Sequence, residues 1–242
     1  MSGQAVTAHS PTQAQSRFVM RVFYVFLALA AFSVLISIAG RVLGSNLAQV
    51  GHTDDTRLVE AVVGNNVLYV PANYIRFEKQ RVTGEARRLD LYLRWPDLAG
   101  YSNAARDDFN HQGGVRRVLF LSVEQQLMSR DMSARFDPIY SRLIDLPGVP
   151  AVAGLRSYQF KESSGYMSET LMVGGGANGR PFVARCLTGA VAAESLAPCE
   201  RDVHFGDELS LTYRFPAELL GEWRALDAAV LGKMQAFLRT GQ

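Results

Sequence analysis

The sequence predicts an α+β protein with one N-terminal transmembrane helix, followed by a mainly antiparallel sheet domain that a C-terminal amphipathic helix covers. Three observations lead to this prediction: an uncharged apolar run between Arg21 and Arg41, short segments in which apolar and polar residues alternate, and an apolar stripe with helical spacing after Pro216. Beyond the first helix, about 180 residues remain for one domain, which is enough to bury a core.

The uncharged run is long enough to cross a bilayer. At about 1.5 Å per helical residue it spans roughly 28 Å, close to the hydrocarbon thickness of a membrane, and its many Val, Leu, Ile and Phe residues favour insertion. The alternative is a signal peptide cleaved after Ala39, because Ser37-Ile38-Ala39 is a small-x-small triplet. The run is longer than the apolar part of most signal peptides, so we expect an anchor.

The flanking charges predict the orientation and the division of the chain. Arg17 and Arg21 precede the run, and residues 1–40 contain no acidic residue. A single arginine, Arg41, follows directly after the run, and Asp54, Asp55, Arg57 and Glu60 come next. The positive-inside rule then places the N-terminus in the cytoplasm. We expect a disordered cytoplasmic tail over 1–16, a transmembrane helix over 17–43, a stalk over 44–56 and a periplasmic α+β domain over 57–242.

Period-two alternation and turn residues predict the strands. Leu58–Val63 and Val67–Val70 flank Gly64-Asn65-Asn66, which is typical of a hairpin. Residues 89–95 and 209–215 alternate between apolar and polar side chains, and the continuous apolar run 118–123 indicates a central strand. Further strands are expected at 155–160, 166–173 and 182–187.

Two helices are expected in the domain. Asp137 with Pro138 can cap and open the first, whose apolar face would be Ile139, Tyr140, Leu143 and Ile144. The second has Pro216 in its first turn. Its stripe comprises Leu219, Leu220, Trp223, Leu226, Val230, Leu231, Met234, Phe237 and Leu238, and it should cover the sheet.

The chain has two cysteines, Cys186 and Cys199. Without further ligands nearby they make a poor zinc site, whereas in an oxidising compartment they would close a short loop and contribute about 3 kcal/mol. Two unrelated buried thiols are the alternative. The predicted disulfide agrees with a domain outside the cytoplasm.

Composition indicates the compartment and excludes one class of partner. Arginine outnumbers lysine 22 to 3, as in GC-rich bacterial genomes, and no Asn-x-Ser/Thr sequon is present. We therefore expect the inner membrane and periplasm of a Gram-negative bacterium. A net charge of +2 without a basic cluster argues against nucleic acid as a partner.

The glycine-rich segment 174–180 is the first candidate for an interaction. It lacks the Gly-Lys-Ser/Thr ending of a phosphate-binding loop, and strand-like segments lie on both sides of it. We therefore expect the tip of a hairpin. We regard it as a candidate interaction loop, and a contact with a lipid or a glycan is the less common alternative. Its candidate residues are Gly174, Gly175, Gly176, Asn178 and Arg180.

His204 is the one candidate for acid–base chemistry, because Asp202, Asp207 and Glu208 lie near it in the sequence. A histidine on a polar surface is the commoner case. The four histidines show no metal-ligand spacing, and no Gly-x-Ser-x-Gly elbow is present. We therefore assign no catalytic, metal-binding or cofactor-binding residue and expect no cofactor.

Three features together resemble bacterial single-pass proteins described as transmembrane anchored proteins. They are the apolar anchor, the segments Val70-Pro71-Ala72-Asn73-Tyr74-Ile75-Arg76-Phe77 and Leu89-Asp90-Leu91-Tyr92-Leu93-Arg94-Trp95-Pro96, and the Cys186 to Cys199 loop. The resemblance covers most of residues 20–238. It implies no activity and gives no residue a functional role.

The favoured function is a membrane-anchored accessory or scaffold protein that binds another inner-membrane or periplasmic protein. A tether confines the domain to a layer near the membrane and raises its effective concentration toward neighbours there. The alternative is a cell-envelope hydrolase or ligand-binding enzyme whose acid–base site is assembled in the fold. The oligomeric state stays open.

Overall fold

The computed structural model describes residues 13–48, 51–111, 116–176 and 179–239 and divides into two compact units, Met1–Val50 and Gly51–Gln242. In the first unit, helix α1 (Gln13–Ala48) contains the apolar stretch Val19–Ser37, with a mean hydropathy of 2.3. By length and composition this stretch could serve as a membrane anchor or a signal sequence. Most of the expected tail lies outside the described residues.

The expected stalk, residues 44–56, is divided between the two units: residues 44–48 continue α1, and residues 51–56 belong to the second unit. The chain is held where it enters this unit. The buried Arg81 side chain donates hydrogen bonds to the carbonyl oxygens of Gly51, Ile75 and Arg76. The ring of the half-buried His52 stacks on Tyr101, with 4.7 Å between the ring centroids.

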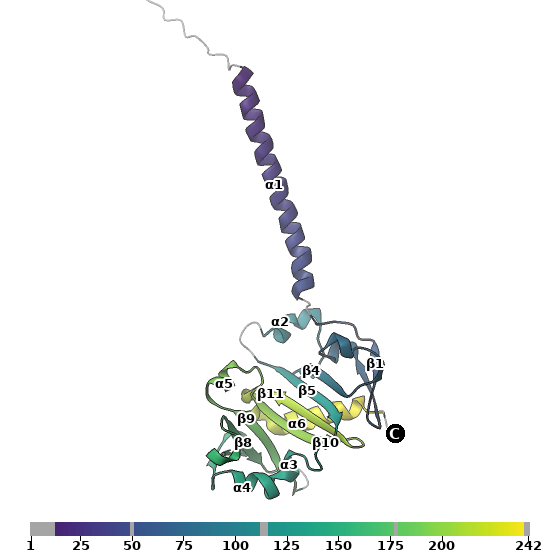
Figure 1. The fold of residues 1–242 in the computed structure, drawn as a ribbon, viewed down its shortest axis with the longest axis vertical. Helices are drawn as coiled ribbons and strands as arrows, with labels where there is room; N and C mark the ends of the chain where they lie inside the picture. Colours follow the sequence, from purple (N-terminus) through teal and green to yellow (C-terminus); the bar gives the residue numbers. More distant parts are fainter. Residues whose placement is uncertain (1–12, 49–50, 112–115, 177–178, 240–242) are drawn as a thin grey trace, which may run out of the picture. The chain divides into compact units, whose positions relative to one another are not determined.

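The second unit contains an eight-stranded antiparallel sheet and a smaller three-stranded sheet, so the predicted α+β class is confirmed (Figure 1). Strand β11 shows why the sheet forms: its inward side chains Leu209, Leu211, Tyr213 and Phe215 are buried, and the residues between them are not. In the smaller sheet, the order is β2 (Asn66–Pro71), β1 (Leu58–Val63) and β3 (Gly84–Glu85). The larger sheet has the order β4 (Arg88–Arg94), β5 (Val118–Gln125), β11 (Leu209–Phe215), β10 (Cys199–Phe205), β9 (Phe182–Leu187), β8 (Glu169–Gly174), β7 (Arg156–Gln159) and β6 (Val149–Pro150).

The C-terminal helix covers one face of the large sheet, as predicted. The chain passes from β11 through a 3₁₀ helix η8 (Ala217–Glu222) into α6 (Trp223–Phe237), which lies behind β10 and β11 in Figure 1. Each of its buried aliphatic and aromatic side chains contributes about 1.5–3 kcal/mol. They are Trp223, Leu226, Val230, Met234 and Phe237.

The opposite face of the sheet carries two smaller apolar clusters. At one end, the 3₁₀ helix η3 (Asn103–Ala105) and α2 (Arg106–Phe109) cover Tyr92 and Val118. At the other end, a helical segment covers Leu171 and Val183; it consists of α3 (Met132–Arg135), the π-helical turn η4 (Phe136–Tyr140) and α4 (Ser141–Leu143). Four 3₁₀ turns, η1 (Ala72–Tyr74), η2 (Glu78–Gln80), η5 (Val152–Gly154) and η6 (Glu162–Ser164), and α5 (Gly189–Glu194) connect the strands.

The expected start of the first domain helix was wrong. Asp137 and Pro138 lie inside η4, and the N-cap of the helical segment is Asp131, whose Oδ1 accepts a hydrogen bond from the Ala134 backbone N–H at 2.9 Å. The apolar face is partly as expected, because Tyr140 and Ile144 are buried whereas Ile139 is exposed. The segment Asp131-Met132-Ser133-Ala134 carries an N-cap signal of its own.

Candidate functional site

The large sheet opens between β9 and β10. The register between these strands consists of the pairs Cys186↔Cys199 and Arg185↔Glu200, and the predicted disulfide between Cys186 and Cys199 joins the strands at this end. Such a bond is typical of an oxidising compartment. Helix α3 contacts both β9 and β10. The paired register ends at Arg185 and Glu200, and beyond it α3 supplies hydrogen-bonding groups to β10.

A buried arginine lies where the sheet opens. Arg201 on β10 donates from Nε to Asp227 Oδ1 at 3.0 Å and from Nη1 to Ser133 Oγ and the Val183 carbonyl oxygen at 3.0 and 2.9 Å. The Tyr213 hydroxyl donates to the same Asp227 oxygen at 2.6 Å. Complete burial raises the pKa of Tyr213 well above 10, so this hydroxyl remains a donor at neutral pH.

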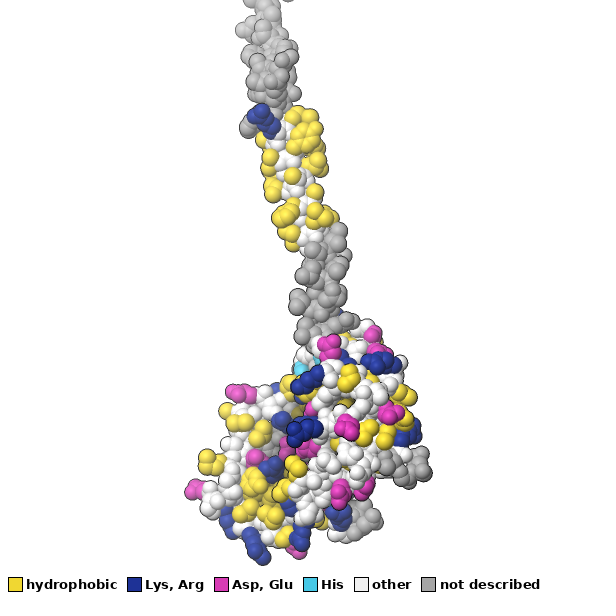
Figure 2. Space-filling model, turned by 45° about the vertical axis from the view of Figure 1, so that its right-hand side comes forward, with side chains coloured by type: hydrophobic (Ala, Val, Ile, Leu, Met, Phe, Trp, Pro, Cys, Tyr) yellow, Lys and Arg dark blue, Asp and Glu magenta, His cyan; other side chains and the backbone are white. Residues whose placement is uncertain are grey.

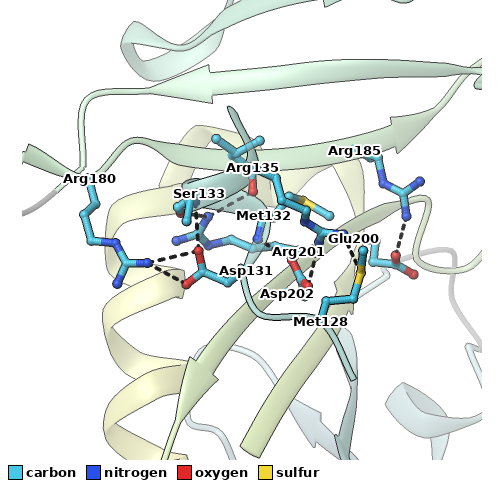
Figure 3. Close-up of polar contacts among 12 residues, drawn as sticks. Met128, Asp131, Met132, Ser133, Arg135, Arg180, Arg185, Glu200, Arg201 and Asp202 are labelled. Carbon is cyan, nitrogen blue, oxygen red and sulfur yellow. Dashed lines mark hydrogen bonds and ion pairs between the residues drawn. The ribbon is translucent and has the colours of Figure 1, made fainter. Parts of the chain in front are cut away.

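Helix α3 is fixed to β10 by a second ion pair. Arg135 donates from Nη2 to both carboxylate oxygens of Asp202 at 2.7 Å, and Asp202 Oδ1 also accepts from the Met132 backbone N–H at 2.7 Å (Figure 3). Both side chains are largely buried. The carboxylate of Asp202 thus accepts its hydrogen bonds from residues of α3.

The glycine-rich connection between β8 and β9 reaches the same region. Arg180 donates from Nη2 to the two oxygens of Asp131 at 3.1 and 3.0 Å, so the connection is joined to the N-cap of α3. Two glycines are required by close packing. A Cβ on Gly174 would lie 2.8 Å from the Trp223 ring, and a Cβ on Gly176 would lie 2.0 Å from the Arg180 carbonyl oxygen.

These elements enclose a cavity of about 620 Å³, which we call the hairpin cavity. Its apolar wall comprises Phe182, Val203, Trp223 and Leu231, and the rings of Phe182 and Trp223 lie 4.5 Å apart between centroids. Volumes of about 300–1,000 Å³ with mainly apolar walls are typical of ligand sites. Its polar lining comprises Asp131, Ser133, Arg180, Arg201, His204, Arg224 and Asp227.

The structure brings several of the candidate interaction residues to this cavity. Gly175, Gly176 and Arg180 line it together with His204. Gly174 is the last residue of β8 and packs behind the cavity wall, against Trp223. Asn178 lies outside the described residues.

The candidate acid–base residues occupy different surroundings. Asp202 is bonded to Arg135, and Asp207 lies on the β10–β11 turn, where its backbone N–H donates to Asn66 Oδ1 at 2.8 Å. Glu208 follows in the same turn with a φ of 52°. Among the residues that the structure describes, His204 makes no hydrogen bond to a carboxylate, and no group of three or more His, Cys, Asp or Glu could hold a metal ion. In the described part of the chain, the contacts of His204 therefore include no carboxylate that would orient its ring.

Sequence reasoning missed the polar residues that build the cavity. Local patterning does not select Arg201 or Asp227, and Asp131 and Ser133 lie outside the helices that the sequence predicts. One signal was present: Arg201 stands between Cys199 and Val203 at an inward position of its strand. A charged residue at such a position requires a buried partner.

A second hollow, of about 450 Å³, lies on the face of the sheet that α6 does not cover. Its lining includes Arg76, Arg88, Asp90 and Glu200, together with the exposed Arg214, which forms no ion pair in the described part of the chain. Figure 2 shows acidic and basic side chains close together on the visible face of this unit. We call the hollow of about 450 Å³ the open-face hollow.

No protein-family model matches the chain, and no curated protein matches its sequence. Two solved structures have a similar fold. An immunity protein of the Stenotrophomonas maltophilia type IV secretion system is 15% identical, with a TM-score of 0.49, and the match covers 76% of this chain and 94% of that protein. The Neisseria meningitidis iron-regulated outer membrane lipoprotein FrpD is 11% identical, with a TM-score of 0.43, and the match covers 77% and 94%. Neither likeness assigns a role to a residue of this chain.

Proposed function

We propose that this chain is a membrane-anchored accessory protein of the bacterial cell envelope, and that its hairpin cavity docks a segment of another envelope protein. The N-terminus would lie in the cytoplasm, α1 would cross the inner membrane, and the unit Gly51–Gln242 would lie in the periplasm. The apolar stretch Val19–Ser37 supports the anchor, and the disulfide supports an oxidising compartment for the folded unit.

The observation that carries the docking proposal is the construction of the hairpin cavity. An apolar wall that includes Trp223 is bordered by charged groups that already have partners, Arg201 with Asp227 and Arg180 with Asp131. Such a site requires little reordering when it binds, and tryptophan and arginine are the residues that contribute most at interfaces. The surroundings of His204 give less support to acid–base catalysis, because no carboxylate of the described residues is hydrogen-bonded to its ring.

The topology is tested with reporters fused after Gln242. A reporter that is active only in the periplasm should be active there, because the predicted orientation exports the whole globular unit. Activity of a cytoplasm-only reporter at the same position would overturn the orientation and the compartment together.

The docking is tested by photo-crosslinking in the intact envelope. We place benzoylphenylalanine at Gly175, which is exposed and has open space where a Cβ would stand. The cavity is then filled by Ala228→Phe, and the matched control is Ala225→Phe; both alanines are exposed on α6, and Ala228 lines the cavity.

We expect an adduct with one envelope protein, lost in Ala228→Phe and retained in Ala225→Phe at equal protein levels. An adduct that persists in both variants would show that the partner does not use the cavity. Absence of any adduct from Gly175 would contradict docking at this site.

A further inference from the structure

The charges that line the hairpin cavity do not cancel. Arg180 is paired with Asp131, and Arg201 with Asp227. Arg224 also lines the cavity, and within the described ranges it forms no ion pair. The cavity therefore carries one positive charge without a negative partner, and this charge is at Arg224.

Arg224 is held in place beside the apolar wall. Its Nη1 donates to the Ala153 carbonyl oxygen at 3.0 Å, and its guanidinium carbon lies 4.2 Å from the centroid of the Trp223 ring. Residue 224 is exposed, so the remaining N–H groups of the guanidinium can reach a ligand. Such a planar cation can bind a carboxylate through two parallel hydrogen bonds, because the two carboxylate oxygens match its N–H groups.

We propose that the hairpin cavity recognises a carboxylate joined to an apolar group, with Arg224 binding the carboxylate and the Phe182–Trp223 wall binding the apolar group. This inference rests on the proposed docking function and specifies the chemistry of the docked segment. The C-terminal residue of a partner chain that ends in an apolar side chain contains both parts. Charge complementarity disfavours a cationic segment, because Arg224 would repel it.

The test uses two small probes, N-acetyl-phenylalanine and its amide, which differ in the carboxylate. The full chain is placed in lipid nanodiscs with 15N-labelled tryptophan, so that its two tryptophans, Trp95 and Trp223, give two indole signals. Trp223 lines the cavity and Trp95 does not, which makes Trp95 the internal reference. The variant is Arg224→Gln, and the control is Arg214→Gln, which removes an exposed arginine that lines the open-face hollow instead.

We expect N-acetyl-phenylalanine to shift the Trp223 signal with a Kd about tenfold lower than that of the amide, because only the acid forms charge-assisted hydrogen bonds. Arg224→Gln should remove this difference, and Arg214→Gln should keep it. Equal binding of the two probes, or a preference that survives Arg224→Gln, would overturn the carboxylate assignment. A cavity that responds to neither probe at millimolar concentration overturns it as well, while the Gly175 crosslink still decides the docking function separately.

Discussion

The two faces of the eight-stranded sheet differ in what covers them. One face packs its buried strand residues against α6, forming the main core with Leu226, Val230 and Met234. The opposite face has an apolar cluster at each end, and the open-face hollow, whose lining mixes charged and apolar side chains, lies on the same face. Stability is therefore concentrated on the α6 face. The hairpin cavity lies at the border of that core, where Trp223 belongs both to the core and to the cavity wall.

The largest effect is expected at Trp223. Trp223→Ala should lower the free energy of unfolding by about 3–5 kcal/mol, because it removes a large buried side chain that packs on Phe182. Arg214→Ala on the opposite face should change it by less than about 0.5 kcal/mol. Chemical denaturation of both variants measures the difference, and similar values for the two would mean that α6 does not form the main core.

The next effect is expected at the disulfide, where the sheet begins to open. Replacing Cys186 and Cys199 together by alanine should lower stability by about 3 kcal/mol, since the bond limits the unfolded chain. Mass spectrometry of unreduced protein from the envelope should find one linked peptide pair. Two alkylatable thiols in that sample would argue against both the bond and the compartment.

A smaller effect is expected at the N-cap of α3. Asp131→Ala should cost about 1–2 kcal/mol, because the buried carboxylate caps the helix and accepts from Arg180. Arg180→Ala should cost less than about 1 kcal/mol, since its side chain is 63% exposed. Thermal unfolding of the two single variants and the double variant separates the cap from the ion pair. Equal costs for the single variants would assign the effect to the ion pair alone.

The smallest effect is expected at His52, whose ring stacks on Tyr101 in the aromatic cluster on the sheet face that α6 does not cover. Burial, and after it the charge of Arg81, lowers the pKa of His52 below 6.5. The neutral ring is therefore favoured in the folded state, and this stabilisation is present above pH 6.5 and is lost as the pH falls toward the folded pKa. His52→Phe should reduce the loss of stability on acidification. His111, whose pKa burial also lowers, should retain part of it, and an unchanged slope in His52→Phe would contradict the assignment.

The sequence predicted the parts of the fold that depend on local patterning. Alternation and turn residues located β1 and β11 residue for residue, the strand expected at 182–187 has the bounds of β9, and helical spacing located the stripe of α6. Strand β10 was missed, because Cys199–Phe205 contains charged residues and its inward positions include Arg201. Only a tertiary partner makes such a residue compatible with a buried position.

The cavity could be predicted from the sequence only in part. Sequence alone makes the glycine-rich loop and His204 candidates, and of these Gly175, Gly176, Arg180 and His204 line the cavity. The residues that give the cavity its polar character come from distant segments: Arg201 meets Asp227 across 26 positions and Ser133 across 68. No local pattern encodes contacts over such sequence distances. The positive charge of Arg224 in the cavity, unpaired among the described residues, could therefore be found only from the folded structure.

The contacts that Arg81 and His52 make at the start of the second unit have a mechanical consequence. A pulling force that reaches the unit at Gly51 first meets the hydrogen bond from Arg81 and the stacked ring of His52, and then the bond from the Asn73 N–H to the Asp55 carbonyl oxygen. Arg81 also binds the carbonyl oxygens of Ile75 and Arg76, so part of the tension passes into the segment before β4 and bypasses β1. Under tension, the hairpin of β1 and β2 would therefore be shielded until the Arg81 contacts break.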